Sequence, residues 1–168
     1  MDDSVSVRQA GPADIPAIHR IQLHSGLPAS EPARLEAAIE DPDRLVLVAG
    51  LDDQAAGVDG HVAGWAKTHF WPEGDGAAPA GHYLGGVAVD PDLRGRGVGG
   101  RLTLARLQWI WRRAAEAWYV TNARNTASIA LHRQYGFEEV ARAPRFHTTT
   151  FDGGVGILWR AMPGDRHG

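Results

Sequence analysis

The stretch Asp92–Gly100, DLRGRGVGG, holds four glycines and two arginines in nine residues. Glycine loses more conformational freedom on folding than other residues, so a chain keeps such a stretch where side chains would obstruct a close approach. It follows a strand-like segment and precedes a helical pattern. The first N–H groups of a helix have no partner in the helix and carry partial positive charge. We therefore expect a phosphate here, in particular a pyrophosphate, with Arg94 and Arg96 adding charge-assisted hydrogen bonds.

Length and composition indicate one soluble globular domain over residues 1–168, with 43% hydrophobic and 22% charged residues. The net charge of −3 argues against general attraction to nucleic acid. Between Leu93 and Ala115, however, there are six arginines and no acidic residue. This uneven charge favours a local anion site, although a solvated helix face also explains Arg106, Arg112 and Arg113.

Cysteine is absent, which excludes disulfides, thiolate zinc sites and a cysteine acyl-enzyme, and we expect no metal. No run approaches 18 apolar residues, so no membrane span is expected. The N-terminal segment MDDSVSVRQA lacks the basic start and apolar core of a signal peptide. These features predict a cytoplasmic protein without a membrane partner.

Hydrophobic periodicity predicts the element order β-α-α-β-β-β-α-β-α-β-β, a mixed sheet with helices on its faces. Ser30 is the predicted N-cap of the second helix and Gly136 the predicted C-cap of the last. A stripe on the third helix is expected to pack on the sheet: Val98, Leu102, Ala105 and Trp109, widened by Leu104, Leu107 and Trp111. The expected strands are 5–10, 44–51, 61–71, 82–90, 118–122, 137–146 and 154–162. The expected helices are 12–23, 30–41, 97–116 and 125–136. The expected turns or loops are 51–60, 72–81 and 151–154.

Two other phosphate-binding motifs were compared with the glycine stretch. The chain has no G-x-x-x-x-G-K-[ST], so it is no P-loop. Gly95, Gly97 and Gly100 spell the dinucleotide fingerprint G-x-G-x-x-G, with Glu116 at the distance of a ribose-binding acid. The context differs, because PDLR separates the strand from the first glycine and Glu116 precedes its strand. A dinucleotide-binding protein therefore remains the less favoured alternative.

Two motifs together resemble the GNAT N-acyltransferase superfamily. Arg94-x-x-Gly97-x-Gly99 matches that family's pyrophosphate loop, R/Q-x-x-G-x-G/A. The segment NTASIALHRQYGF, beginning at Asn125, resembles its later motif, which has Asn, a small residue, Leu-aromatic and then Gly-Phe. The element order agrees with that family over nearly the whole chain. The resemblance implies an α/β (α+β) fold: a mixed, mostly antiparallel sheet of six to seven strands, helices on both faces and a central strand splay.

The resemblance also implies a function, acyl transfer from acetyl-CoA to a primary amine of a small molecule or peptide. In the family the strand before the loop splays from its neighbour and pairs with the pantetheine arm, and the residues that follow bind the pyrophosphate. Asn125 and Ser128 would line the same cleft from the other side. The CoA-binding residues implied in this chain are Val87, Ala88, Val89, Arg94, Gly95, Arg96, Gly97, Val98, Gly99, Gly100, Asn125 and Ser128.

Transfer to an amine needs a neutral amine, a polarised thioester carbonyl and a proton for the leaving thiolate. Without cysteine or G-x-S-x-G, direct attack in a ternary complex is favoured, with a backbone N–H near Val87 polarising the carbonyl. The resemblance gives the proton donor to His132, where the family usually has Tyr; Tyr135 is a second candidate. His132 lies on one helix face with Asn125 and Ser128.

The base and the acceptor are less defined. Many relatives place a Glu on the strand before the loop, and this strand has no acid. Tyr83 shares a face with Gly85 and Val87 and should face the cleft. The glycines at 85 and 86 leave space for an acceptor. Further candidates are His82, Glu73 and Asp75 for a base acting through water, and Trp65 and Trp71 for acceptor contacts.

The missing carboxylate keeps a second class of function open, a non-catalytic acyl-CoA-binding sensor. The six tryptophans and the two C-terminal strands offer apolar surface, and relatives often dimerise. We therefore expect a homodimer.

Overall fold

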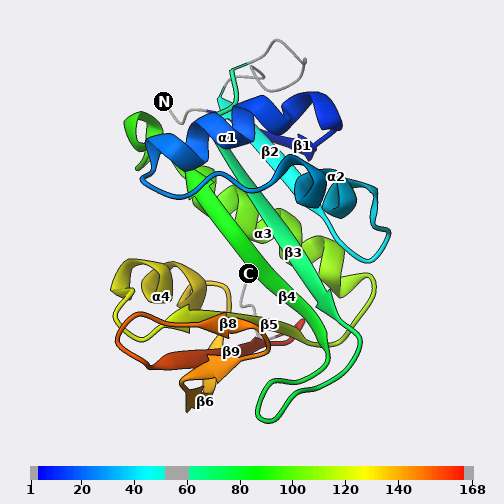
Figure 1. Ribbon diagram of the computed structural model, residues 1–168, viewed down its shortest axis with the longest axis vertical. Coiled ribbons are helices and arrows are strands. Elements are labelled where there is room, and N and C mark those ends of the chain that lie inside the picture. The colour runs from blue at the N-terminus through cyan, green and yellow to red at the C-terminus, as the bar shows by residue number, and fades with distance from the viewer. Residues whose placement is uncertain (1–3, 52–60, 165–168) are drawn as a thin grey trace. The chain divides into compact units, whose positions relative to one another are not determined.

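The computed structural model describes residues 4–51 and 61–164 (Figure 1). Within these residues no helix has the length and apolarity needed to cross a membrane. The elements are β1 (Val5–Gln9), η1 (Pro12–Asp14), α1 (Ile15–His24), α2 (Pro32–Glu40), β2 (Val46–Leu51), β3 (Gly64–Trp71), β4 (Gly81–Val89), η2 (Pro91–Leu93), α3 (Val98–Trp111), β5 (Ala117–Asn122), α4 (Thr126–Arg133), β6 (Glu138–Ala143), β7 (Arg145–Phe146), β8 (Thr149–Thr150) and β9 (Gly156–Ala161).

Seven strands form one sheet in the order β1-β2-β3-β4-β5-β9-β6, and β7 and β8 form a separate hairpin. The pairs β1–β2, β2–β3, β5–β9 and β6–β9 are antiparallel, whereas β4–β5 is parallel. Within the described chain, the β4–β5 register ends at Leu84 opposite Tyr119, although β4 continues to Val89. The predicted mixed, mostly antiparallel sheet with a splayed central strand is confirmed.

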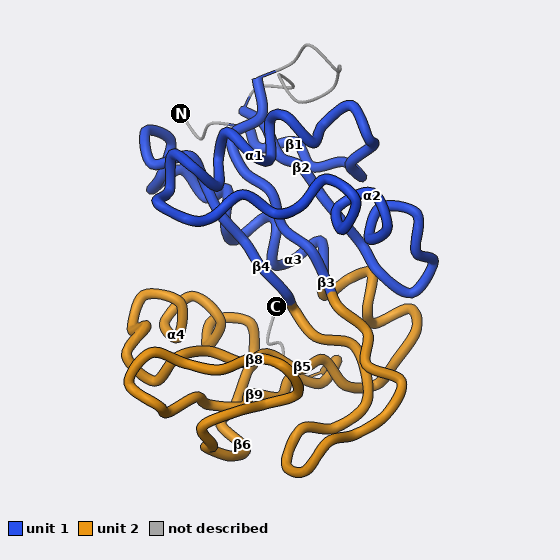
Figure 2. Tube along the Cα trace, in the orientation of Figure 1, with its two compact units in different colours: residues 1–68, 85–106 blue, residues 69–84, 107–168 orange. Residues whose placement is uncertain are grey.

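The chain divides into two compact units (Figure 2): unit 1 is Met1–Thr68 with Gly85–Arg106, and unit 2 is His69–Leu84 with Leu107–Gly168. Both units are discontinuous, and β3, β4 and α3 each run from one into the other. A single domain over residues 1–168 therefore stays a prediction.

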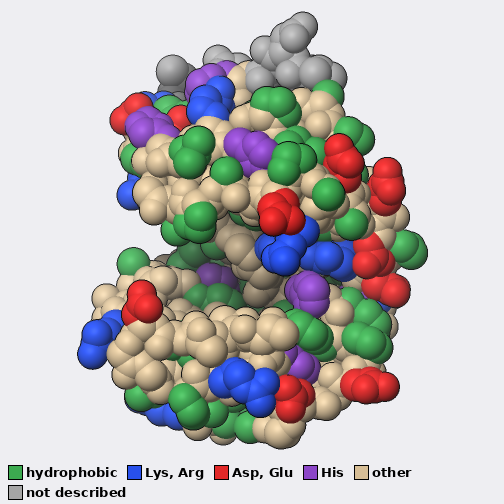
Figure 3. Space-filling view, viewed as in Figure 1, with side chains coloured by type: hydrophobic (Ala, Val, Ile, Leu, Met, Phe, Trp, Pro, Cys, Tyr) green, Lys and Arg blue, Asp and Glu red, His purple; other side chains and the backbone are tan. Residues whose placement is uncertain are grey.

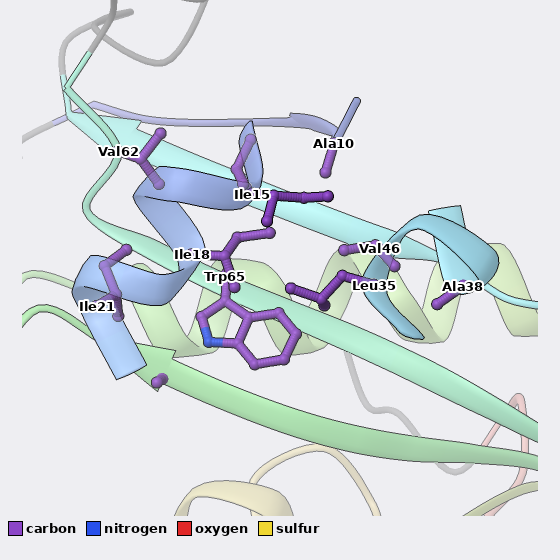
Figure 4. Close-up of a cluster of buried hydrophobic side chains, with 11 residues drawn as sticks. Ala10, Ile15, Ile18, Ile21, Leu35, Ala38, Val46, Val62 and Trp65 are labelled. Carbon is purple, nitrogen blue, oxygen red and sulfur yellow. The ribbon is translucent and has the colours of Figure 1, made fainter. Parts of the chain in front are cut away.

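Unit 1 has helices on both faces of its strands. On one face, Trp65 of β3 packs with Ile18 of α1 and Leu35 of α2 in a buried cluster (Figure 4). On the other face, a Cβ added to Gly64 would lie 2.8 Å from Val98 Cγ1 of α3. Alternation along β3 thus separates the two helix layers, and glycine at 64 allows α3 to pack close to the strand.

Arg106 of α3 is completely buried in unit 1, so assigning it to a solvated helix face was wrong. Its Nη1 donates to the carbonyl oxygens of Lys67 (3.2 Å) and Gly85 (3.3 Å), which belong to β3 and β4. Its Nη2 donates to Thr103 Oγ1 and its Nε to Leu102 O. The predicted apolar stripe is confirmed at Val98, Leu102, Leu107 and Trp109, which are buried. Its other members Leu104, Ala105 and Trp111 are only half-buried, whereas Thr103, Arg106 and Ile110 are buried as well.

Unit 2 contains the C-terminal strands, α4 and a second cluster of buried residues. Tyr83, Trp118, Phe146 and Leu158 belong to that cluster, so the hairpin β7–β8 contributes to the core through Phe146. The expected strand 137–146 was therefore wrong in part, because β6 ends at Ala143 and β7 begins at Arg145, whereas the expected strand 154–162 is present as β9. The turn Phe151–Gly154 joins the hairpin to β9 and does not join β6 directly.

Two predicted helix caps were also wrong. The N-cap of α2 is Glu31, whereas Ser30 Oγ accepts a hydrogen bond from Gln22 Nε2 at 2.8 Å. The C-cap of α4 is Gln134; Gly136, with φ +86°, supplies the left-handed turn two residues later. The predicted antiparallel pair β2–β3 is confirmed, and most of its connecting turn at 51–60 lies outside the described residues.

Candidate functional site

The glycine stretch forms the entry to α3 in unit 1. Gly95 and Gly97 have φ of +80° and +83°, a backbone region that disfavours other residues. A Cβ added at either position would meet nothing within 4 Å. The backbone conformation, and not crowding within the protein, therefore requires glycine here. The open space over the loop is what a bound phosphate would need.

Charge and exposure at this loop suit an anion. Residues 94–97 are exposed, and Arg94 and Arg96 flank Gly95 in the sequence. The first turn of α3 follows at Val98, and no acidic residue lies in that turn. The N–H groups at the start of the helix and two guanidinium groups thus lie within one short segment. This combination of hydrogen-bond donors and positive charge binds phosphate in many proteins.

Packing and local bonds hold the loop in place. Val98 is 1% exposed and belongs to the core with its side chain, so its predicted part in CoA binding is restricted to its backbone. Gly99 O accepts from Thr103 Oγ1 at 2.8 Å, while Gly99 and Gly100 are half-buried. The loop therefore continues directly into a helix whose first side chain is anchored.

An ion-paired group precedes the loop. Asp90 caps η2 by accepting from Asp92 N at 3.0 Å, and His24 Nδ1 at the end of α1 lies 3.2 Å from Asp90 Oδ1. Together, His24, Asp90 and Asp92 offer three ligand atoms within 4.8 Å of one another, the spacing of a metal site. The cap of η2 and the contact between His24 and Asp90 link α1 to the loop.

The end of β4 carries the residues expected to meet the pantetheine arm. Ala88 is buried, and Val87 and Val89 are half-buried, so their side chains contribute to packing. The β5 register has ended before Val87. The space expected over Gly85 and Gly86 is filled in part: Cγ of Lys67 lies 3.0 Å from a Cβ position on Gly85, and Trp65 Cη2 lies 3.6 Å from one on Gly86.

A second group of predicted residues gathers on α4 in unit 2. Asn125 is the N-cap, and its Oδ1 accepts from Ser128 N at 3.2 Å. Ser128 Oγ is hydrogen-bonded to the Tyr119 hydroxyl of β5. His132 is 1% exposed and stacks on Tyr119, with ring centroids 3.7 Å apart. Tyr119 is a residue that the sequence reasoning missed.

The bonding of His132 bears on its predicted role as the acid. Its Nδ1 lies 2.8 Å from the Ser128 carbonyl oxygen, which can only accept, so Nδ1 carries a proton. In the neutral ring Nε2 then has no proton to give, and donation from Nε2 requires the imidazolium form. The Tyr119 hydroxyl is a neutral donor in the same cluster, and Tyr135 is half-buried nearby in sequence.

Tyr83 lies in the core cluster of unit 2 and is 4% exposed. Its hydroxyl donates to Pro79 O at 2.6 Å, and His147 Nε2 lies 3.3 Å from it. Burial raises the pKa of Tyr83 well above its usual range. A hydroxyl that is already a donor and holds its proton more tightly is poorly suited to act as a base, so the predicted catalytic role of Tyr83 is not favoured.

The other candidates for base and acceptor contacts have structural roles. His82 is buried beside Phe70 and Trp109. Asp75 pairs with Arg145 at 3.1 Å, and Trp71 stacks on His147 at 4.2 Å. Glu73 is exposed, and Trp65 belongs to the core of unit 1.

A pocket of about 640 Å³ in unit 2 is lined by Arg133, Gly136, Phe137, Glu138, Glu139, Trp159 and Gly164, none of them a predicted site residue.

Comparisons with known proteins agree with the two motifs. The model of the acetyltransferase (GNAT) family matches residues 15–137. A mycothiol acetyltransferase of Saccharomonospora viridis is 38% identical over 91 residues, which cover 51% of this chain and 29% of that protein. The ribosomal protein bS18-alanine N-acetyltransferase of Escherichia coli is 33% identical over 78 residues, 46% of this chain and 52% of that one. The chain thus spans about half or less of these relatives' length.

Solved structures show the same fold. The Escherichia coli ribosomal-protein-S18-alanine N-acetyltransferase matches with a TM-score of 0.70 at 22% identity, covering 98% of this chain and 99% of that one. A phosphinothricin acetyltransferase of Sinorhizobium meliloti, solved in complex with acetyl-CoA, matches with a TM-score of 0.71 at 20% identity, covering 96% and 89%. On the family match, the motifs and the fold, the chain belongs to the GNAT acetyltransferase family.

Proposed function

We propose that the protein is an N-acetyltransferase that transfers the acetyl group of acetyl-CoA to a primary amine. The observation that carries this proposal is the exposed loop 94–97, in which two left-handed glycines alternate with Arg94 and Arg96 directly before the start of α3. It occurs in a chain of the GNAT family, and its relatives include enzymes named as N-acetyltransferases of a protein alanine.

In this proposal the backbone of the loop binds the pyrophosphate and the two arginines neutralise its charge. The end of β4, from Val87 to Val89, pairs with the pantetheine arm, and an N–H near Val87 polarises the thioester carbonyl. The chain has no cysteine, so the amine attacks the thioester directly. A new amide bond forms as the C–S bond breaks, the amine nitrogen gives up a proton to water, and the thiolate takes a proton from an acid of the protein.

The proton donor is proposed to come from the hydrogen-bonded cluster of Tyr119, Ser128 and His132. His132 keeps its proton on Nδ1 for the Ser128 carbonyl. The Tyr119 hydroxyl, bonded to Ser128 Oγ, is the neutral group able to donate. This extends the sequence prediction, which gave the role to His132 or Tyr135.

A non-catalytic acyl-CoA sensor is the second candidate, favoured by one observation. Strand β4 has no carboxylate, and Tyr83 is unsuited to replace one. Release of free CoA thiol with a panel of amines separates the two functions: turnover above the rate of hydrolysis supports the enzyme, and tight acetyl-CoA binding without turnover supports the sensor.

Calorimetry tests the donor. We expect acetyl-CoA to bind with a Kd in the micromolar range or tighter and NAD not to bind. NAD binding without acetyl-CoA binding would contradict the proposal and favour the dinucleotide alternative.

A homodimer and a cytoplasmic location remain predictions. Four of the six tryptophans are buried (Trp65, Trp109, Trp118 and Trp159), so they offer little surface. Val140 of the edge strand β6 is 47% exposed and Met162, after β9, is 40% exposed. The proposed dimer therefore rests on the C-terminal strands, and light scattering at tens of micromolar tests it: a monomer mass would count against it.

A further inference from the structure

Lys67 of β3 occupies an unusual place in unit 1. The sequence contains sixteen arginines and this single lysine. Alternation puts Lys67 on the same face of β3 as Trp65, which packs beneath α1 and α2 (Figure 4). Its partner across the sheet, Val46 of β2, belongs to the same cluster. The lysine therefore lies on the α2 side of the sheet, where a core would ordinarily place an apolar residue.

The aliphatic part of Lys67 lies across the two glycines of β4. Its Cγ and Cε lie 3.0 Å and 3.4 Å from a Cβ position on Gly85, and its Cε lies 3.7 Å from one on Gly86. Larger residues at 85 would collide with this side chain. The glycines thus allow a cation to reach over β4, directly before Val87, where the proposed function places the acyl arm.

Two arginines join the lysine. Arg44 lies two residues before Val46. Two hydrogen bonds, each 2.9 Å long, fix the main chain there: Leu45 N–H donates to Thr68 Oγ1, and Thr68 N–H donates to Leu45 O. Arg34 extends from α2. The pKa of Lys67 is lowered, first by burial and then by the positive charges of Arg44 and Arg34. Lys and Arg side chains gather just below α2 in the space-filling view (Figure 3).

This positive charge is poorly compensated. In the part of the chain that the structure describes, no carboxylate lies within 4.0 Å of the charged groups of Lys67 or Arg44. The Nε of Arg44 is buried and has no hydrogen-bond partner among the described residues. Asp41 acts on Arg44 only over a longer distance, and Glu31 pairs with Arg34 at 3.8 Å in an exposed position. Like charges held together without acids cost stability unless an anion binds.

We propose that Lys67, Arg44 and Arg34 form a subsite for an anionic group of the acceptor. The acceptor would be an amine that also carries a carboxylate or a phosphate. The phosphates of acetyl-CoA have their own place at the loop 94–100, so this second cationic group is available to the other substrate. The inference rests on the proposed function, because it assigns the acceptor of the same reaction.

Matched acceptors test the subsite through activity. Amines with carbon chains of equal length would end in a carboxylate, a phosphonate or a neutral carboxamide. A charge-assisted contact favours the anionic acceptors by about tenfold or more in kcat/KM, mainly through KM. Lys67→Met, similar in length but uncharged, should remove this preference, measured as the ratio of kcat/KM for the carboxylate and the carboxamide within the same variant. Arg112→Gln is the control, because it removes a positive charge from an exposed residue beyond the end of α3. This variant should keep the preference for anionic acceptors.

Wild-type protein that turns over the carboxylate and the carboxamide equally well would overturn the subsite. So would a Lys67→Met variant that keeps the preference. Preference for only one of the two anions identifies whether the acceptor group is a carboxylate or a phosphate.

A second measurement does not depend on activity or on a mutant that folds. Reductive ¹³C-methylation labels Lys67 and the N-terminal amine, so NMR follows the single lysine through a pH titration. Butyrate or inorganic phosphate, at constant ionic strength, should raise the pKa of Lys67. A pKa unchanged by both anions would overturn the subsite. A raised pKa in a protein that acetylates no amine would retain the anion site and contradict only the proposed function.

Discussion

Gly97→Val is the most informative substitution in the loop, because the structure predicts two separate effects. Gly97 has φ +83°, and the left-handed region costs other residues about 1 to 2 kcal/mol. For a chain of this size, each kcal/mol lowers the unfolding midpoint by about 2 to 4 °C. The sequence alone left open whether valine would be tolerated; this φ indicates that the variant folds with reduced stability.

The second effect concerns acetyl-CoA. The space around a Cβ at Gly97 is open, and in the proposed function it holds the pyrophosphate. A branched side chain there should raise the Kd at least roughly tenfold, about 1.4 kcal/mol. Calorimetry measures the Kd, and thermal unfolding confirms that the variant is folded at the assay temperature.

Gly154→Val separates strain from obstruction. Gly154 has φ +79°, also has no atom within 4 Å of an added Cβ, and lies in the turn before β9 in unit 2. It should lose similar stability and keep its affinity for acetyl-CoA. A folded Gly97→Val protein that binds acetyl-CoA as tightly as wild type would refute the placement of the phosphate.

Three further predictions concern charge and proton transfer. Arg94→Ala should weaken acetyl-CoA binding by about tenfold at low salt and less at high salt, because the contact is charge-assisted and exposed; equal loss in both salts by calorimetry would contradict it. Tyr119→Phe should lower kcat by about 10²-fold with little change in acetyl-CoA affinity. If His132→Phe shows this loss of kcat and Tyr119→Phe does not, the proton donor is His132. Arg8 donates two hydrogen bonds to buried Asp14 and holds the pKa of that carboxyl below its usual value. Because the pKa of Asp14 is lower in the folded than in the unfolded state, its carboxylate stabilises the fold at pH values above the ordinary carboxyl pKa, and this stabilisation is lost as pH falls through the folded-state pKa. Denaturant unfolding from pH 7 to 3 should therefore show a steeper decrease in the free energy of unfolding for wild type than for Asp14→Asn.

The sequence predicted the elements that depend on local patterns. The glycine stretch, the antiparallel pair β2–β3 and a helix that begins near Asn125 each follow from residues near in the chain. The hairpin β7–β8 was missed because its strands are two residues long, and alternation over two residues carries no signal. Its place in the core through Phe146 depends on contacts with distant residues.

The candidate site was predicted in its charged loop and less well in its catalytic groups. Arg94 and Arg96 are exposed, as a loop motif indicates. Periodicity put Tyr83 on the cleft face, but packing against Trp118 and the bond to Pro79 decided its environment. The pairing of Tyr119 with Ser128 joins a strand to a helix, so no spacing along the chain could show it.

The buried guanidinium of Arg106 has a consequence for how unit 1 assembles. Two of its partners are main-chain oxygens on β3 and β4, and these come into position only when α3 has docked and both strands lie side by side. A partly formed sheet would leave a desolvated cation with fewer acceptors than in the folded protein, and burial of an incompletely bonded charge is costly. Intermediates with α3 packed on a single strand are therefore strongly disfavoured. We expect β3, β4 and α3 to exchange their amide hydrogens as one cooperative unit, and not strand by strand.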